Sequence, residues 1–354
     1  MYKNIEEIKD IISSYTGPKL RIMEVCGTHT HQIFKLGIRQ ILPENIELIS
    51  GPGCPVCVTA VSYIDEAVML ALEHKVTVIT FGDLLRVPGS RKSLAEARAM
   101  GAKIKIVYSP LDALQYAADH LREEVVFLSV GFETTTPGSA IAVRNAKKEE
   151  IHNFSVLTAN KTMHQAYLAL EKSADAFLYP GHVSTMTGMN VYRSLRDEKG
   201  ISGVVTGFTA TEILTALAVI IIESQKGKPF AVNAYPSVVT EEGSEKARKI
   251  VDMIMEPCDA EWRGLGIISG SGLKLRNEYK AYDARKKFSL PQLKGETHKF
   301  CRCGEVLRGK CKPYECKLFG RVCTPEHPVG ACMVSGEGAC SAFYKYGGSL
   351  WRIK

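Results

Sequence analysis

Cysteines are the residues of this chain whose number and spacing most directly suggest chemistry. Seven of the 11 lie between Cys301 and Cys340. A structural zinc site usually shows two close pairs of ligands, whereas the spacings here are wider and the thiols outnumber those that one zinc needs. Four thiolates can bind a [4Fe–4S] cluster, whose irons lie far enough apart to accept loosely spaced ligands. The tail therefore predicts an iron–sulfur cluster on four of its seven cysteines, in preference to zinc.

Outside the tail, Cys26 begins the segment CGTHTH near the amino terminus, at residues 26–31. Cys26 follows an apolar run and precedes a helical pattern, and a helix start favours a thiolate through its N–H groups and dipole. His29 and His31 add metal ligands or proton-transfer groups. Burial as a small apolar residue is the alternative for Cys26. Helix capping is the alternative for the two threonines of the segment.

A C-x-x-C pair follows in GPGCPVC, at residues 51–57. Cys54 and Cys57 at this spacing can close a disulfide, chelate a metal or exchange between these states. Half of a zinc site has the same appearance, but the other half is missing nearby. The segment therefore favours redox chemistry or an open, shared metal site.

Polar residues also follow the apolar run at residues 125–130. Glu133 and the three threonines after it precede Pro137 and a helix, where hydroxyl and N–H groups suit a polar ligand. Helix capping with proline in the first turn explains the same pattern. His164 and His182 begin later loops and are candidates for the same crevice, or ordinary hydrogen-bonded histidines.

The elements that must position these residues alternate between strands and helices. Amphipathic helical patterns separate apolar, β-branched runs at residues 20–25, 46–50, 76–81, 104–108, 125–130, 154–159, 176–180 and 203–208. Such alternation predicts parallel sheets covered on both faces. Because binding crevices lie beyond the carboxyl ends of parallel strands, we expect the loops carrying Cys26, Cys54, Glu133 and His182 to line one edge.

The expected fold class is α/β, with two parallel-sheet α/β domains of related topology and a smaller Cys-rich [4Fe–4S] domain. We place the first domain at residues 17–125, with Cys26, Cys54 and Cys57, and the second at 126–235. The cluster domain spans 236–354, and a helix at 1–16 is a candidate to pack on it.

Composition excludes several classes of protein. The longest apolar stretches, such as Ile213–Glu223, are too short to span a bilayer, so no membrane association is expected. Eleven cysteines without a secretion signal indicate reduced thiols and a cytoplasmic protein. The net charge of +7 comes with no nucleic-acid-binding motif, so no nucleic acid is expected. A basic stretch at residues 276–294 is either a solvated face or a docking surface for an acidic protein or small anion.

Together these segments resemble the HypD family of [NiFe]-hydrogenase maturation factors over nearly the full length. The resemblance rests on MEVCGTHTH (residues 23–31), SGPGCPVCVT (50–59), TFGD (80–83), GFETTTP (131–137), PGHVS (180–184) and the Cys-rich tail. Family members have two related α/β domains and a cluster domain. The family spacing of four cysteines, with 14, 6 and 16 residues between them, fits Cys301, Cys316, Cys323 and Cys340. It leaves Cys303, Cys311 and Cys332 outside, although Cys303 in place of Cys301 is an alternative.

The resemblance also implies a task, assembly of the Fe(CN)₂CO unit before it enters the hydrogenase large subunit. Cys26 would bind iron together with HypC, a tightly bound partner that passes the unit to the large subunit. HypE would deliver cyanide transiently as a thiocyanate. Cys54 and Cys57 would bind iron or supply the thiols that release cyanide, with electrons from the cluster. His29, His31 and Glu133 would supply protons or hydrogen bonds.

This role is that of a scaffold and redox assembly factor, a metallochaperone, rather than of a multiple-turnover enzyme. The alternative from a different class is a stand-alone, cluster-dependent thiol–disulfide oxidoreductase with Cys54 and Cys57 as its active pair. A Cys-rich interaction module that holds zinc is a third.

Overall fold

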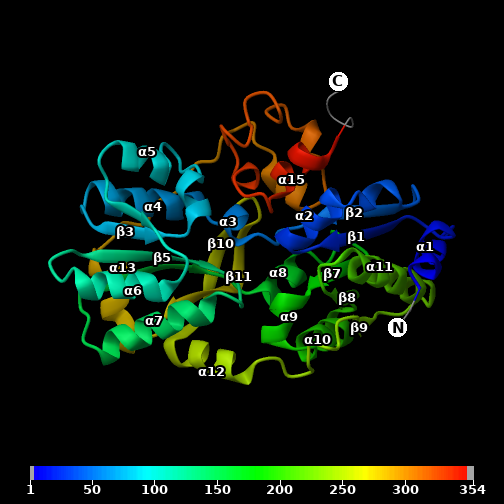
Figure 1. The fold of residues 1–354 in the computed structure, drawn as a ribbon, viewed down its shortest axis with the longest axis horizontal. Helices are drawn as coiled ribbons and strands as arrows, with labels where there is room; N and C mark the ends of the chain where they lie inside the picture. Colours follow the sequence, from blue (N-terminus) through cyan, green and yellow to red (C-terminus); the bar gives the residue numbers. More distant parts are fainter. Residues whose placement is uncertain (1–3, 349–354) are drawn as a thin grey trace.

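The computed structural model describes residues 4–348 and contains two parallel sheets (Figure 1). The larger sheet has the strand order β2-β1-β7-β8-β9, and all of its pairs are parallel. Its strands are β1 (Leu20–Glu24), β2 (Ile46–Ser50), β7 (Ala176–Pro180), β8 (Gly203–Thr206) and β9 (Ala231–Asn233). Their apolar side chains alternate between two cores, with Ile22 in one and Met23 in the other, as a doubly covered sheet requires.

The second sheet has the order β4-β3-β5-β6 and is also parallel throughout. It consists of β3 (Thr77–Thr80), β4 (Ile104–Ile106), β5 (Val125–Gly131) and β6 (Phe154–Asn160). In both sheets the second strand along the chain lies outside the first, and later strands extend the opposite side. The α/β class and the related topology of the two sheets are therefore confirmed.

Helices cover both faces of each sheet. In the larger sheet α1, α2 and α11 pack on one face, and α8, α9 and α10 on the other. In the second, α4 and α5 cover one face and α6 and α7 the other. Their bounds are α1 (Ile5–Ser13), α2 (Gly27–Lys35), α3 (Pro55–Val58), α4 (Val61–Leu72), α5 (Leu94–Ala99), α6 (Pro110–Asp119), α7 (Thr136–Lys148), α8 (Met163–Ala169), α9 (Gly181–Thr187), α10 (Asn190–Lys199) and α11 (Ala210–Gln225). Within the described part of the chain, no helix has the length and apolar character to cross a bilayer.

The two sheets divide the chain differently from the predicted domains. The larger sheet takes β1 and β2 from before residue 51 and β7–β9 from after residue 175, and the second sheet lies between them in sequence. The predicted boundary at 125–126 falls within β5 and so divides the second sheet. Sequence alternation alone misplaces it because the pattern of strands and helices continues unchanged where the chain moves between sheets.

A hairpin of β10 (Met255–Trp262) and β11 (Gly266–Leu275) lies between the two sheets (Figure 1). Isolated bridges join Thr59 to Trp262 and Lys161 to Gly272, so the hairpin ties the segment after α3 to the end of β6. The neighbouring α12 (Glu245–Ile254) and α13 (Ala284–Lys287) also contribute to the sheet cores. Residues 245–287 therefore pack with the α/β body, although the predicted third domain begins at 236.

The Cys-rich tail forms a small irregular unit above the body (Figure 1). It contains α14 (Cys303–Leu307) and α15 (Ala339–Tyr346), and short 3₁₀ helices occur along the chain at η1 (Ile38–Gln40), η2 (Gly82–Arg86), η3 (Asn277–Tyr282), η4 (Pro313–Glu315) and η5 (Ala331–Met333). Phe343 meets Phe34 of α2 with ring centroids 5.5 Å apart. On the other side, Arg86 donates to the carbonyls of Pro325 and Val334 at 2.9 and 3.2 Å. The tail thus contacts both halves of the body.

The amino-terminal helix does not pack on the tail, which corrects the expectation for residues 1–16. Ile8 and Ile12 of α1 are buried in the core shared with α11. The apolar face of α11 offers them a larger surface to bury than the small tail does.

We predict that Ile8→Ala lowers the free energy of unfolding by about 2–5 kcal/mol, because it leaves a cavity in this core. Ile8 is 1% exposed, whereas Ile5 on the same helix is 38% exposed. Urea unfolding would measure both variants, and Ile5→Ala is the matched control. Equal destabilisation by the two would contradict the packing of α1 on α11.

Candidate metal and thiol site

The first two cysteine loops meet at the carboxyl ends of neighbouring strands. Cys26 follows β1 and is the N-cap of α2, and Cys54 follows β2 and is the N-cap of α3. The N–H of Gly27 donates to the carbonyl of Gly53 at 3.1 Å. A Cβ on Gly53 would collide with the backbone N and Cα of Cys26. Only glycine allows this approach, and it brings the Cys26 and Cys54 loops together.

Cys26 also lies where the strand order of the larger sheet changes direction. Its strand, β1, has β2 on one side and β7 on the other, and crossover helices diverge from such a point. In open α/β sheets the binding crevice lies beyond the carboxyl ends at this position. The structure therefore places Cys26 at the expected binding position of the fold.

Burial dominates the chemistry of the Cys26 thiol. It raises the pKa of Cys26 to about 12, although the backbone N–H groups of His29 and Thr28 act in the opposite direction. The expectation that the helix start favours the thiolate form of Cys26 is therefore wrong when no cation is bound. Desolvation of the sulfur outweighs the effect of the N–H groups. A bound cation would reverse this balance.

Cys54 and Cys57 are joined by a local hydrogen bond. The backbone N–H of Cys57 donates to the sulfur of Cys54 at 3.4 Å, across the single turn of α3. Pro55 occupies the first position of that turn, where its missing N–H is not needed. Both cysteines are buried free thiols.

Cys332 connects this pair to the tail. Side-chain interactions with Cys303 and Cys57 lower the pKa of Cys332. The same contacts with Cys332 and Cys54 raise the pKa of Cys57, together with burial. An unbroken series of sulfur contacts therefore leads from Cys54 through Cys57 and Cys332 to Cys303.

The predicted cluster cysteines share one small cavity in the tail. Cys301, Cys316, Cys323 and Cys340 all line it, and Cys303 is a fifth thiol on the same wall. Cys303 accepts a hydrogen bond from Cys301, with their sulfurs 3.3 Å apart, and another from Cys340. Five thiols thus face a space for which four ligands were predicted.

Gly330 shapes this thiol cavity. A Cβ at this position would lie 2.6 Å from the sulfur of Cys303 and 2.8 Å from that of Cys301. Within residues 4–348, no three histidine, cysteine, aspartate or glutamate side chains converge closely enough to hold a single metal ion. The thiols instead line a narrow cavity of about 10 Å³.

The two histidines of the CGTHTH segment have different environments. His29 is fully buried, and its Nε2 lies 2.8 Å from the carbonyl oxygen of Gly207, so this nitrogen carries the proton. Burial lowers the pKa of His29 to about 4, and its Nδ1 has no hydrogen-bond partner. At neutral pH His29 is therefore an acceptor rather than an acid. His31 instead contacts the tail, with Nδ1 3.2 Å from the carbonyl oxygen of Gly336.

Glu133 follows β5 of the second sheet. Its Oε1 accepts the backbone N–H of Met163 at 2.7 Å, and Oε2 is shut off from solvent without a partner. Burial raises the pKa of Glu133 to about 7. Such a carboxyl group is partly protonated at neutral pH and can give or accept a proton.

Other predicted residues divide between this region and distant positions. His182 follows β7 and shares Phe208 with His29, with the His182 and Phe208 ring centroids 5.2 Å apart. Burial lowers the pKa of His164, and the charge of Glu198 of α10 acts in the opposite direction. Cys311 packs with Val306 and Ala339 in a separate small core, and Cys258 lies on β10.

Sequence reasoning missed two residues that the structure brings to the site. Glu337 of the tail accepts a hydrogen bond from the hydroxyl of Thr28 at 2.7 Å, and its charge raises the pKa of Cys26. The second is Cys332, which the family spacing leaves outside the four predicted cluster ligands. No local signal reveals either contact, since each joins residues about 300 positions apart in sequence.

The fold and site are those of a doubly wound parallel α/β body with thiols at its switch point and a Cys-rich tail above them. The HypD family model, described as "Hydrogenase formation hypA family", matches residues 1–347. The chain therefore belongs to the HypD family, whose members are hydrogenase maturation factors.

Individual relatives are similar to this chain over nearly their whole length. The hydrogenase maturation factor HypD of Rhodobacter capsulatus is 42% identical, with 98% of this chain and 94% of the relative covered. That of Escherichia coli is 43% identical, with 97% and 94% covered. A putative hydrogenase expression/formation protein of Methanocaldococcus jannaschii is 41% identical, with 93% and 92% covered.

We predict that Glu133→Gln flattens the pH dependence of stability between pH 4.5 and 7. The raised pKa means that the folded protein holds this proton more tightly than the unfolded chain does, so the wild type loses stability as pH rises through this range. The loss attributable to Glu133 is about 3 kcal/mol at pH 8 relative to pH 4. Urea unfolding at a series of pH values would measure it, with the exposed Glu7→Gln as control. Parallel profiles for wild type and Glu133→Gln would contradict the assignment.

Proposed function

We propose that this hydrogenase maturation factor is the scaffold and redox assembly protein on which the Fe(CN)₂CO unit is built. Cys26 binds the iron, and HypC supplies further ligation in a tight complex and carries the finished unit to the hydrogenase large subunit. The contact between the Cys26 loop and the Cys54 loop through Gly53 is the observation that carries this proposal.

The Cys26 thiol suits a metal that arrives as substrate. Soft thiolates match iron that carries cyanide and CO. The buried thiol keeps its proton at neutral pH, and an iron ion offsets the cost of the buried charge when the proton leaves. His29 presents an unpaired Nδ1 and Glu133 a carboxyl group with a pKa of about 7, so we assign to them hydrogen bonding and proton transfer during assembly.

Cys54 and Cys57 are assigned to the release of cyanide delivered by HypE. Cleaving the sulfur–carbon bond of a thiocyanate takes two electrons, and oxidation of two thiols to a disulfide supplies them. The products are the HypE thiol and cyanide, and the two protons come from the thiols of the pair.

The tail fits a resident [4Fe–4S] cluster. Cys301, Cys316, Cys323 and Cys340 would hold it, and the one cavity that all four cysteines line supports this fit. A cluster of this kind supplies single electrons when bound. Cys303 and Cys332 provide the sulfur contacts that lead from the tail to Cys57.

The contact between the Cys54 and Cys26 loops favours this role over a stand-alone oxidoreductase, because it places the C-x-x-C pair in a site shared with Cys26. Both Cys54 and Cys57 are buried in this site. All 11 cysteines are free thiols, which supports a reducing compartment, the cytoplasm.

We predict that Cys26→Ala abolishes the infrared bands of CO and cyanide in the complex purified anaerobically with HypC. The change removes the iron ligand but leaves the tail thiols in place, so visible absorption of the cluster is retained. Cys258→Ala, which removes a cysteine of β10, is the matched control and keeps the bands. Wild-type complex without these bands, or a Cys26→Ala complex that retains them, would rule out iron binding through Cys26.

We also predict that Cys332→Ser slows reduction of a Cys54–Cys57 disulfide by about tenfold or more, since the sulfur connecting it to Cys303 is gone. The oxidised protein would be reduced with dithionite, and the new thiols counted over time by alkylation and mass spectrometry. Cys311→Ser, in a separate core, serves as the control. An unchanged rate in Cys332→Ser would show that electrons reach the pair by another route.

A further inference from the structure

The tail holds most of the net positive charge of the chain. Residues 299–326 contain seven lysine or arginine residues and three glutamates, which gives this segment a net charge of +4. The whole chain has a net charge of +7. More than half of the excess charge therefore lies in one small unit above the α/β body (Figure 1).

Three of these cations are exposed and unpaired. Lys299, Lys317 and Arg321 lie at the surface, and none of them forms an ion pair within residues 4–348. Arg302 of the same segment, by contrast, is held by Glu305 at 2.5 Å. Exposed like charges repel one another, and these three have no carboxylate of the chain to compensate them.

Exposed apolar side chains accompany the cations. Phe300 is 53% exposed and Val322 is 60% exposed, although both are large and apolar. The ammonium group of Lys299 lies over the Phe300 ring, 5.0 Å from its centroid, and Val322 follows Arg321 directly in the chain. Large apolar side chains that stay in water beside uncompensated charges are typical of a surface to which another protein binds.

The exposed residues adjoin the accessible cysteines of the predicted cluster. Cys301 and Cys316 are partly exposed, whereas Cys323 and Cys340 are buried. The thiol of Cys316 donates to the carbonyl oxygen of Phe300 at 3.7 Å. A protein bound at Phe300 would therefore lie close to the sulfurs of the tail.

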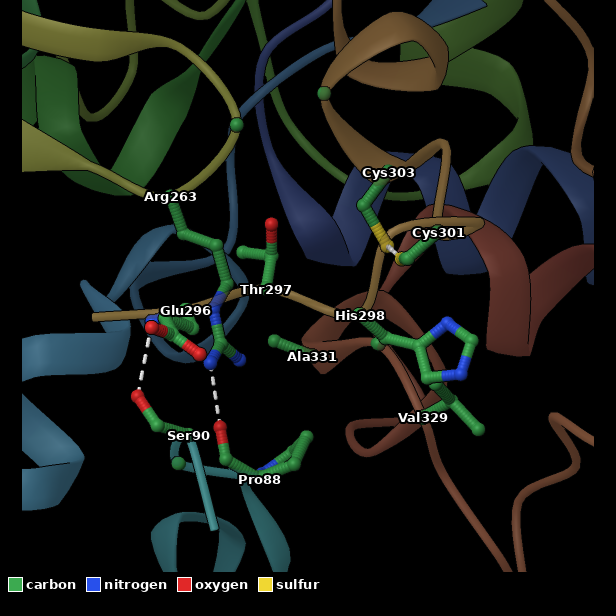
Figure 2. A pocket seen from close by; sticks show the side chains of 14 residues that line it. Pro88, Ser90, Arg263, Glu296, Thr297, His298, Cys301, Cys303, Val329 and Ala331 are labelled. Atoms are coloured by element: carbon green, nitrogen blue, oxygen red, sulfur yellow. Dashed lines mark hydrogen bonds between the residues drawn. The ribbon is translucent and has the colours of Figure 1, made fainter.

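This surface is distinct from the cleft between the tail and the body. Thr297, His298 and Cys301 line that cleft (Figure 2). Lys299 and Phe300 lie between His298 and Cys301 in sequence but do not line the cleft, and both are exposed. Their side chains therefore face the solvent outside it.

We propose that the outer tail surface, formed by Lys299, Phe300, Lys317, Arg321 and Val322, docks a small acidic protein that carries single electrons. Carboxylates of the carrier compensate the three cations and steer its approach. The two apolar side chains supply a small contact area, as in the weak complexes of electron-transfer proteins. This inference rests on the proposed function, in which electrons reach the thiol pair through the tail.

Each docking event transfers one electron, so the carrier is oxidised and the tail is reduced. Two such transfers, together with two protons, return a disulfide between Cys54 and Cys57 to two thiols. Because two carriers must dock in turn, a weak complex that dissociates quickly suits this surface better than a tight one.

The test uses anaerobically purified full-length protein and oxidised flavodoxin, an acidic FMN protein, as the probe. Isotope-labelled flavodoxin is expected to show saturable NMR shift changes, and added salt should weaken the complex. Lys317→Glu combined with Arg321→Glu weakens binding by about tenfold or more, equivalent to about 1.4 kcal/mol. Lys172→Glu combined with Lys228→Glu is the matched control and retains the affinity, since these exposed lysines precede β7 and β9, at the opposite ends of the strands from the thiol loops.

A second variant tests the apolar part of the surface without changing its charge. Phe300→Ala is expected to weaken binding by about threefold or more, because it removes an aromatic contact. Met253→Ala removes a side chain that is also 53% exposed, on α12, and should leave the affinity unchanged. Both variants should keep the thermal stability of the wild type, so this pair decides the question if the charge-reversed protein fails to fold.

Carbodiimide cross-linking locates the bound carrier, because it joins lysine amines to carboxylates in contact with them. Mass spectrometry is expected to find the links at Lys299 and Lys317. Absence of flavodoxin binding would overturn the proposal, as would unchanged affinity in a folded double variant or links confined to other lysines. A single-stranded oligonucleotide that binds more tightly than flavodoxin, and is lost from the double variant, would assign the surface to nucleic acid instead.

Metal analysis of the same sample separates this proposal from the proposed function. Protein that lacks iron and sulfide but binds flavodoxin through Lys317 and Arg321 would refute the cluster and keep the docking surface. Protein that holds a full cluster but does not bind flavodoxin would keep the cluster and refute the docking surface.

Discussion

The close approach of Gly53 to the backbone of Cys26 is the constraint on which the site depends. Neighbouring parallel strands place the two loops side by side, but only the missing Cβ lets them touch. The tail then closes over this contact. Glu337 accepts a hydrogen bond from Thr28, and Cys332 interacts with Cys57. These two contacts of the tail with the body therefore rely on a geometry fixed by two strands and one glycine.

Burial determines the protonation state of the Cys26 thiol. In water a thiol near a helix start loses its proton readily, whereas Cys26 here is held neutral by its surroundings. Burial likewise raises the pKa of Glu133 to about 7 and lowers that of His29 to about 4, so the neutral forms of all three groups are favoured. A site of this kind favours binding of a cation together with release of protons, and excludes water from the bound groups.

The sequence pattern predicted those features of the structure that depend on residues close together in the chain. Strands of continuous apolar residues, the helix starts after Cys26 and Cys54, and the edge at which they meet all follow from periodicity and turn chemistry. The division of the chain between sheets did not follow, because β1 pairs with β7 across about 150 residues and the alternation of strands and helices continues where the chain changes sheet, after β2 and after β6. The bonds of Glu337 and Cys332 depend on how the tail packs on the body, which spacing does not encode.

The insertion of one sheet within the other also dictates an order of events on the ribosome. All four strands of the second sheet are complete by residue 160, before the larger sheet has received β7. The first two strands of the larger sheet must wait for residues 176–233, and the tail is made last. Long-range pairing of this kind forms late, because loop closure precedes any gain from contact. The thiols of the body and those of the tail are therefore brought together only after the tail has been made.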